Sequence, residues 1–267
     1  MVALTAWWPK YLAIVTRFGY SVEEDQHAAS ILSQMIADHA TPVSRIRSII
    51  KDKNVADCGA GPSLPQNLKV AMKARLLAGS VLIAADGATT ALVNRHLQPD
   101  LIVSDLDGKL PDIIRAQRKG AIVVVHAHGD NISLLKRHVP QLLQLDTRTN
   151  GVLGSTQARP CPGVVNFGGF TDGDRCVFLA EECGARVIAL LGMDLGDVVG
   201  RYSKPTLTRD SPASPVKREK LLVAKELLEW LATTSRSQLV NLTGGTTPIR
   251  GIPDQPIIPG VWNANAD

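Results

Sequence analysis

Asp105 and Asp107 stand two residues apart, shortly after the apolar run Leu101-Ile102-Val103. Three β-favouring residues in a row predict a buried strand of a parallel sheet. In an extended backbone, side chains at i and i+2 point to the same face, about 6.5 Å apart along the chain. The two carboxylates therefore converge at the strand end, where open α/β sheets bind ligands. Such oxygen ligands favour Mg²⁺; the alternative is that the aspartates only form a turn or cap a helix.

A glycine-rich stretch, Gly59-Ala60-Gly61-Pro62-Ser63-Leu64, offers a second kind of chemistry. It starts like a dinucleotide-binding fingerprint, but Leu64 stands in the place of the third glycine and Pro62 is unusual there. The glycines allow the backbone to approach a ligand closely, and the N-terminus of the following helix offers N–H donors to an anion. An S-adenosylmethionine or NAD site and a plain tight turn remain alternatives.

Asp86-Gly87 repeats the carboxylate theme after an earlier apolar run, and His126 and His128 share a face after a later one. The two imidazoles suit hydrogen bonds to a phosphate or a substrate better than zinc, because no nearby Cys or third His completes a zinc site. A purely structural role is the alternative for this pair.

The stretch 168–175 brings Asp172, Asp174 and Arg175 together at the predicted start of a helix. These residues indicate either a further part of the same site or a capped helix N-terminus. Arg suits a phosphate because its planar guanidinium matches two oxygens at once.

Alternating strands and helices must position these residues. From Val55 to Leu242 the pattern predicts an α/β fold with a doubly wound, mostly parallel sheet, whose polar strand ends meet at one edge. Strands are predicted at 55–58, 81–85, 101–103, 121–125, 164–167, 187–191 and 239–242. Helices are predicted at 65–77, 111–119, 132–143, 175–184 and 217–231, with a further helix that follows residues 86–90 and continues through Arg95. Residues 146–163, which are rich in Thr, Gly and Pro, are expected to form an irregular connection.

The first 52 residues have a different, purely helical pattern. Glu23, Glu24 and Asp25 place negative charge at a helix start, and apolar residues recur at helical spacing from Ala28 to Ile36. Residues 1–52 are predicted to form an N-terminal helical cap or a contact between copies of the chain in a homo-oligomer. Residues 53–267 are predicted to form the α/β catalytic domain with a C-terminal tail.

Composition excludes several classes of protein. The net charge of +4 comes without a dense Lys/Arg run, so nucleic acid is not an expected partner, whereas an anionic substrate is compatible with it. The four cysteines lack zinc-type spacing and are predicted to be reduced thiols. We expect a soluble, cytoplasmic protein, because no apolar run reaches the length of a membrane span and no signal-peptide pattern is present.

Together these motifs resemble the archaeal-type 6-hydroxymethyl-7,8-dihydropterin pyrophosphokinases, whose core is similar to the thiamin pyrophosphokinase catalytic domain. The residues that carry the resemblance are 59–64, 85–88, 99–108, 126–131 and 169–175, with weaker matches at 18–21, 241–245 and 251–253. They span most of the chain in the family's order.

The resemblance implies Mg²⁺-dependent transfer of diphosphate from ATP to the hydroxymethyl group of a reduced pterin, with release of AMP, in pterin biosynthesis of the tetrahydromethanopterin or folate type. It implies catalytic roles for Asp105, Asp107 and Arg175, and Mg²⁺ ligation by Asp86, Asp105, Asp107 and Asp172. Nucleotide- or pterin-binding residues are then Gly59, Gly61, Ser63, Gly87, His126, His128, Asn131, Thr171 and Arg175. Candidate phosphate contacts from the segment 200–220 are Lys204, Lys217 and Arg218.

Three alternatives remain at this point. A thiamin pyrophosphokinase-like enzyme has the same core, but no run of strands follows that could form the β-sandwich that helps to build the thiamin site. Asp105-Leu106-Asp107-Gly108 also resembles the first motif of haloacid-dehalogenase-type phosphatases, with Asp105 as the nucleophile. Against this, Lys109 stands where Thr or Val is usual. A non-catalytic nucleotide-binding protein is the third alternative, and the presence of all the Asp residues disfavours it.

Overall fold

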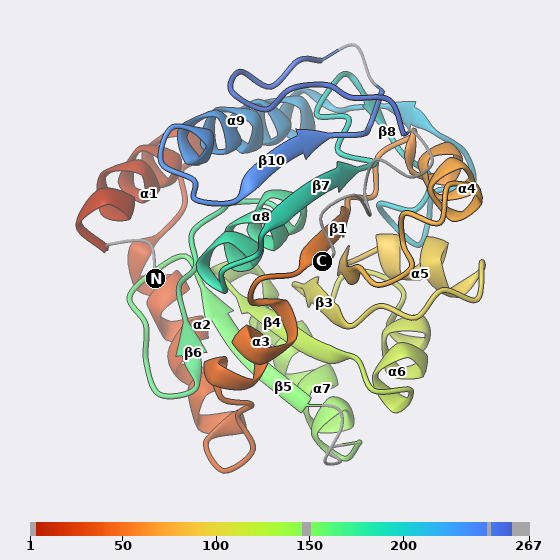
Figure 1. Ribbon diagram of the computed structural model, residues 1–267. Helices are drawn as coiled ribbons and strands as arrows, with labels where there is room; N and C mark the ends of the chain where they lie inside the picture. The colour runs from red at the N-terminus through yellow and green to blue at the C-terminus, as the bar shows by residue number, and fades with distance from the viewer. Residues whose placement is uncertain (1–3, 146–150, 245–246, 258–267) are drawn as a thin grey trace.

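A parallel sheet runs through the centre of the molecule (Figure 1). The computed structural model describes residues 4–145, 151–244 and 247–257. Within these residues, eight strands form one sheet in the order β10-β7-β1-β2-β3-β4-β5-β6, and all neighbouring strands are parallel. The predicted doubly wound parallel sheet is confirmed. The outer ends of the predicted cap and tail (1–3 and 258–267) lie outside the described residues.

The strands are short. Their bounds are β1 Asn54–Cys58, β2 Val81–Ala85, β3 Leu101–Ser104, β4 Ile122–Ala127, β5 Gly151–Thr156, β6 Val164–Val165, β7 Val187–Leu191 and β10 Gln238–Asn241. An antiparallel pair separate from this sheet consists of β8 Val198–Val199 and β9 Ser211–Pro212.

The helices connect successive strands and precede the sheet at the N-terminus. Their bounds are α1 Leu4–Phe18, α2 Val22–Ile36, α3 Val43–Ile50, α4 Leu64–Lys73, α5 Ala88–Val93, α6 Leu110–Arg118, α7 Ile132–Leu143, α8 Asp172–Glu182 and α9 Pro215–Ala232, with a 3₁₀ turn, η1, at Gly129–Asn131.

Both faces of the sheet are covered, because successive side chains of a strand point to opposite faces. On β1, Val55 packs into a core with α1, α3, α8 and α9, whereas Ala56 packs with α4 and α5. Alternate residues of β4 pack with α2, α6 and α7. All of β4 is buried. A strand buried on both faces needs a continuous apolar run, which explains the sequence Ile122-Val123-Val124-Val125.

The N-terminal helices share the core of the sheet. In α1, Trp7 is fully buried, and its ring centroid lies 6.4 Å from that of Phe178 in α8. Arg17 of α1 forms an ion pair with Glu219 of α9, which lies beside it (Figure 1). α2 packs against β5 and α7 on the other face. Its N-cap, Ser21, accepts the backbone N–H of Glu24 at 3.1 Å.

The prediction of an irregular connection over 146–163 is wrong for 151–156, which form β5 between β4 and β6; residues 146–150 lie outside the described residues. The small residues that suggested a loop are required by close packing. A Cβ at Gly151 would lie 2.0 Å from Thr41 Oγ1, and a Cβ at Gly154 would lie 2.6 Å from Val164 Cγ2. Glycine therefore marks close approach to neighbouring elements here rather than a turn.

The strand order reverses at β1. The chain adds β2 to β6 on one side of β1 and then returns to add β7 and β10 on the other side. The carboxyl ends of β1 and β7 therefore border a crevice of the kind in which open α/β sheets bind ligands.

All four cysteines are free thiols. Among the described residues, no helix combines the length and the apolar character that crossing a membrane requires.

Candidate active site

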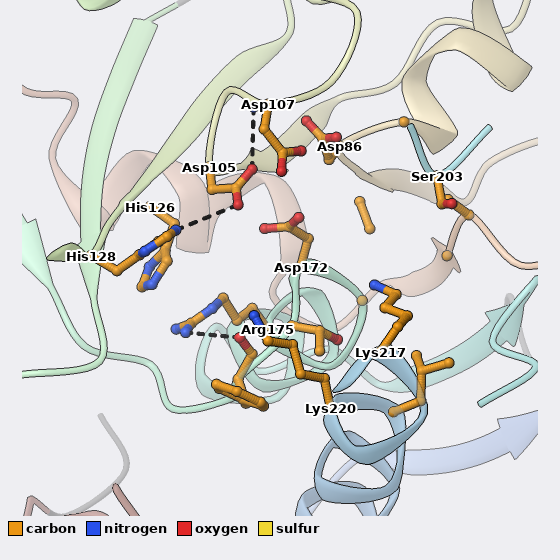
Figure 2. Close-up of a pocket in the computed structure, with 18 of the residues that line it drawn as sticks. Asp86, Asp105, Asp107, His126, His128, Asp172, Arg175, Ser203, Lys217 and Lys220 are labelled. Atoms are coloured by element: carbon orange, nitrogen blue, oxygen red, sulfur yellow. Dashed lines mark hydrogen bonds and ion pairs between the residues drawn. The ribbon is translucent and has the colours of Figure 1, made fainter. Parts of the chain in front are cut away.

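A cavity of about 440 Å³ opens at the carboxyl edge of the sheet (Figure 2). Its wall comes from the loops after β1, β2, β3, β4 and β7, the start of α8, and parts of α2 and α9. The residues predicted for the site that line this cavity are Gly59, Gly61, Asp86, Gly87, Asp105, Asp107, His126, His128, Asn131, Thr171, Asp172 and Arg175. Elements far apart in the sequence thus meet at one place, because parallel strands present their carboxyl ends at the same edge.

Three carboxylates form the centre of the cavity. One oxygen each from Asp86, Asp105 and Asp107 lies within 4.8 Å of the other two. Ser104 at the end of β3 connects their loops, since its hydroxyl donates to Asp86 Oδ1 at 2.5 Å and accepts the Leu106 N–H at 2.9 Å. Asp86 (φ 36°) and Leu106 (φ 68°) adopt left-handed backbone conformations, which cost roughly 1–3 kcal/mol each and are typical of functional sites.

The electrostatics of this cluster favour a cation. Burial raises the pKa of Asp86 to about 7, and the Asp105 carboxylate adds to the rise. Burial and Asp105 also raise the pKa of Asp107, against the opposing Lys204 ammonium. For Asp105, burial pushes the pKa upward, but His128 and Lys204 outweigh it, and the pKa falls to about 2. A divalent cation would relieve the repulsion among these oxygens, and an all-carboxylate donor set fits Mg²⁺.

Asp172 faces the same space from the first turn of α8 (Figure 2). Its carboxylate is not part of the three-residue cluster. Burial raises its pKa well above the ordinary value, with contributions from Asp105, Asp86 and Asp107. Asp174 has a structural role, because it accepts the N–H groups of Phe170 (2.6 Å) and Thr171 (2.7 Å) and so caps α8.

The histidines lie next to the carboxylates. His128 Nε2 is 3.5 Å from Asp105 Oδ2, and the rings of His126 and His128 stack with centroids 5.7 Å apart. Asn131 fixes this arrangement, because its Nδ2 donates to the backbone oxygens of Asp105 (2.9 Å) and His126 (2.7 Å) while its Oδ1 accepts the His128 N–H (3.0 Å). The Asn131 side chain therefore holds the loops after β3 and β4 together.

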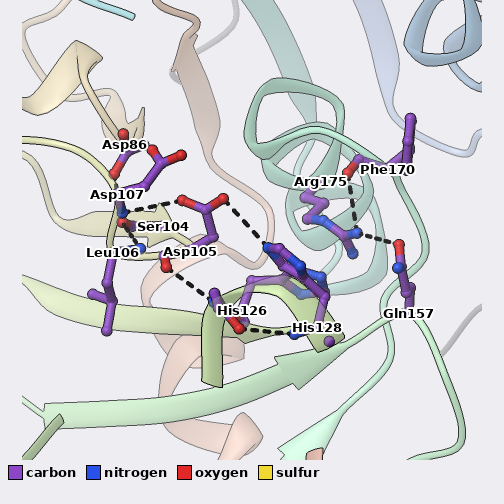
Figure 3. Close-up of polar contacts among 12 residues, drawn as sticks. Asp86, Ser104, Asp105, Leu106, Asp107, His126, His128, Gln157, Phe170 and Arg175 are labelled. Atoms are coloured by element: carbon purple, nitrogen blue, oxygen red, sulfur yellow. Dashed lines mark hydrogen bonds and ion pairs between the residues drawn. The ribbon is translucent and has the colours of Figure 1, made fainter. Parts of the chain in front are cut away.

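Arg175 is buried and forms part of a polar network (Figure 3). Its Nη2 donates to Gln157 Oε1 at 3.0 Å and to the Phe170 carbonyl oxygen at 3.1 Å. Gln157 Nε2 in turn donates to Asp25 Oδ2 at 2.7 Å, and Asp25 Oδ1 accepts the Gly129 N–H at 2.8 Å. The network ties the start of α8 to α2 and to the loop after β4.

The glycine-rich loop after β1 packs against the loop after β7. A Cβ at Gly61 would lie 1.9 Å from Asp194 Oδ2, so glycine is required for this approach. Ser63 does not line the cavity. Its N–H and hydroxyl both donate to Asp194 Oδ2, at 3.2 and 2.9 Å. The anion at the N-terminus of α4 is thus Asp194, and these donors are occupied within the protein.

The segment after β7 contributes cations. Lys204 forms an ion pair with Asp107. Lys217 and Lys220, from α9, also line the cavity. Within the described part of the chain, no hydrogen bond or ion pair is formed by the Lys217 ammonium group, and burial lowers its pKa. Arg218 pairs with Asp197 at 2.7 Å and does not line the cavity.

Sequence reasoning missed several lining residues. Asp25 was explained by helix-start charge alone, although it is 3% exposed. Gln157 was hidden in the stretch expected to be irregular. Asp194 follows β7 as Asp86 follows β2, so its position at a strand end was a usable signal. Tyr20 lies in the weakly matching stretch 18–21, and Lys220 gave no signal of comparable strength.

Comparisons with known proteins identify a family that this chain matches. Residues 28–200 match the profile of a family described as "6-hydroxymethylpterin diphosphokinase MptE-like". The chain belongs to this MptE-like family. It is 44% identical over 239 residues to the 6-hydroxymethyl-7,8-dihydropterin pyrophosphokinase of Pyrococcus furiosus, covering 89% of this chain and 97% of that protein. It is 46% identical over 228 residues to the protein of the same name from Methanothermobacter thermautotrophicus, covering 84% and 93%.

A solved structure shares the fold of this MptE-like chain at much lower sequence similarity. The Maf glycosyltransferase from Magnetospirillum magneticum AMB-1 superposes with a TM-score of 0.55 at 15% identity, covering 88% of this chain. The chain spans 38% of that protein. At this identity the likeness concerns the fold alone.

Proposed function

We propose that this chain catalyses the Mg²⁺-dependent transfer of diphosphate from ATP to the hydroxymethyl group of 6-hydroxymethyl-7,8-dihydropterin, with AMP as the second product. The observation that carries the proposal is the cluster of Asp86, Asp105 and Asp107 at the centre of a cavity that also contains lysine ammonium groups. Relatives named for this activity match along nearly their whole length, which supports it. The product would serve pterin biosynthesis of the tetrahydromethanopterin or folate type.

In this reaction the hydroxymethyl oxygen attacks the β-phosphorus of ATP. The bond between that phosphorus and the oxygen bridging to the α-phosphate breaks, the hydroxyl proton leaves, and AMP takes the bonding electron pair. Because the substrates carry the covalent chemistry, the protein contributes positioning and charge stabilisation. Bound Mg²⁺ would neutralise charge on the phosphate oxygens.

Each part of the cavity has a proposed role. Asp86, Asp105 and Asp107 hold the metal ion, and Asp172 is a further ligand or holds a metal-bound water. His128 keeps the Asp105 carboxylate oriented, consistent with their 3.5 Å separation. Lys217 contacts phosphate through its free ammonium group.

Arg175 contacts the transferred diphosphate through the N–H groups that Gln157 and Phe170 leave free. The glycines of the β1 and β2 loops allow the nucleotide to approach the backbone. Asn131 and Thr171 hold these loops in place, since their polar atoms bond within the protein.

The proposal is tested by incubating the protein with ATP, Mg²⁺ and a panel that includes 6-hydroxymethyl-7,8-dihydropterin and thiamin, and quantifying AMP by chromatography. AMP is expected only with the pterin and a divalent cation, and chelation should abolish it. Asp105→Asn and Asp107→Asn should each lower kcat by at least about 10²-fold, as expected when transition-state charge loses its metal. AMP formation with thiamin alone, or none with any pterin, would contradict the proposal.

A further inference from the structure

His126 presents a buried hydrogen-bond acceptor without a partner. Its side chain is 3% exposed and lines the cavity. Nδ1 lies 3.2 Å from Ser155 Oγ, and the Ser155 hydroxyl donates to the Val125 carbonyl oxygen at 3.4 Å. The Ser155 oxygen therefore accepts the proton of Nδ1, which leaves a lone pair on Nε2. Among the described residues no group bonds to Nε2, so a bound molecule that donates an N–H would satisfy it.

His126 lies close to the carboxylate cluster, because its ring stacks on that of His128, which contacts Asp105. The two imidazole rings lie between Asp105 on one side and Arg175 with Gln157 on the other (Figure 3). Burial lowers the pKa of His126, and the Arg175 guanidinium adds to this effect, so the ring is neutral at physiological pH. A neutral acceptor is a poor neighbour for phosphate oxygens, which are acceptors themselves.

The side of the carboxylates away from the histidines carries a lysine ammonium group. Figure 2 shows Asp86, Asp107 and Asp172 between the histidines and Ser203, with the Lys217 ammonium on the Ser203 side. Lys217 is an unpaired cation among the described residues, whereas the Arg175 Nη2 is already bonded to Gln157 and Phe170. The Lys217 ammonium therefore offers a free positive charge to an anion on the Ser203 side. Lys220, which also lines the cavity, has its ammonium 5.4 Å from the ring centroid of Tyr20 and 5.9 Å from that of Phe170.

In an in-line transfer, the two substrates lie on opposite sides of the phosphorus that is attacked. The attacking oxygen and the leaving oxygen lie on opposite sides of the β-phosphorus. The leaving side carries the anionic α-phosphate and needs cations, whereas the attacking side carries an uncharged pterin ring. The pterin ring has N–H donors on its pyrimidine half, and a phosphate has none.

We propose that the pterin ring binds on the His126 side of the carboxylate cluster, with an N–H of its pyrimidine half donating to His126 Nε2, and that the nucleotide occupies the Lys217 side. This assignment rests on the proposed function and adds the location of each substrate.

Separate binding measurements test the assignment without turnover. His126→Phe keeps a flat ring but removes the acceptor. Binding of 6-hydroxymethylpterin, followed by its fluorescence in the absence of nucleotide, should weaken by at least about tenfold, because the pterin N–H loses its buried partner. Binding of α,β-methylene-ATP with Mg²⁺ should change by less than about twofold, which is below 0.5 kcal/mol. His138→Phe, on α7 outside the cavity, is the matched control and should change neither constant.

A second variant covers the case in which His126→Phe does not fold. Ser155→Ala removes the group that fixes the proton on Nδ1, and should weaken pterin binding more than nucleotide binding. Weaker nucleotide binding with intact pterin binding, equal loss of both, or no change in either would each overturn the assignment. Failure of the proposed function would look different, because the unmodified protein would then form no AMP with any pterin.

Discussion

Replacing Lys217 by Met should separate catalysis from stability. The Lys217 ammonium lines the cavity and, among the described residues, forms no hydrogen bond or ion pair. If it contacts phosphate, its removal deletes a charge-assisted interaction worth about 1.5–3 kcal/mol. The value of kcat/KM for ATP should then fall by roughly 10- to 100-fold.

Stability should respond in the opposite direction. Burial lowers the pKa of Lys217 below the ordinary value of 10.5, so the folded state disfavours the charge. The unfolded chain binds more protons in the window between the lowered pKa and 10.5, and the stability of the unmodified protein rises with pH across that window. Lys217→Met removes this contribution, so its melting temperature at neutral pH should equal or exceed that of the unmodified protein. The difference should shrink as the pH approaches 10.5.

The assay pairs AMP chromatography with thermal melting of the metal-free protein. Lys225→Met on the same helix is the matched control, because Lys225 pairs with Glu229 at 2.9 Å and does not line the cavity. It should retain activity. Full activity in Lys217→Met would exclude the phosphate contact, and a melting temperature several degrees lower at neutral pH would show that the half-buried ammonium stabilises the fold.

Three further substitutions have distinct expected results. Arg175→Lys should lower both turnover and stability, since two hydrogen bonds from Nη2 are lost; the melting temperature should drop by roughly 3 °C or more, and an unchanged melting curve would argue against the network. Asp57→Asn should stabilise the protein at neutral pH. The carboxyl of Asp57 is fully buried, and burial followed by Asp174 raises its pKa well above the ordinary value. The folded state therefore binds more protons than the unfolded chain above about pH 4, so the unmodified protein loses stability as the pH rises. In urea titrations, the free energy of unfolding of the variant should exceed that of the unmodified protein by an amount that grows by about 1.4 kcal/mol per pH unit until the folded-state pKa is reached. A difference that does not change with pH would contradict this. Gly87→Ala should lower kcat by about tenfold or more, because the new Cβ would lie 1.8 Å from the Tyr202 carbonyl oxygen and displace the loop that carries Lys204; wild-type kinetics would show that the loop tolerates the shift.

Much of the fold could be predicted because buried parallel strands have a strong sequence signal. The apolar run of β3 indicated a buried strand of a parallel sheet, and the fixed direction of parallel strands then placed Asp86, Asp105 and His126 at one edge. β5 could not be predicted in this way. Gly151 and Gly154 lower its β-propensity, and their requirement follows from contacts with Thr41 and Val164, which come from other elements of the fold.

The site was predictable only in part for a related reason. Types and spacing of residues identify groups that reach the carboxyl edge, but not which of their atoms are already bonded. Ser63 matched a phosphate-binding pattern, yet its donors are occupied by Asp194, more than a hundred residues away. Asn131 was predicted as a ligand contact and lines the cavity, but the sequence did not indicate that its amide also connects two loops. Such pairings depend on tertiary contacts that one sequence does not reveal.

Direct transfer of diphosphate from ATP to a pterin is the reaction proposed for this cavity. It is measured most simply in a single turnover with [γ-³²P]ATP, Mg²⁺ and 6-hydroxymethyl-7,8-dihydropterin, with simultaneous analysis of nucleotide, pterin and protein. We expect the label to move to the pterin in equal amount to the AMP formed, with no label on the protein. Release of ADP or inorganic phosphate, or a phosphorylated Asp105, would contradict direct transfer.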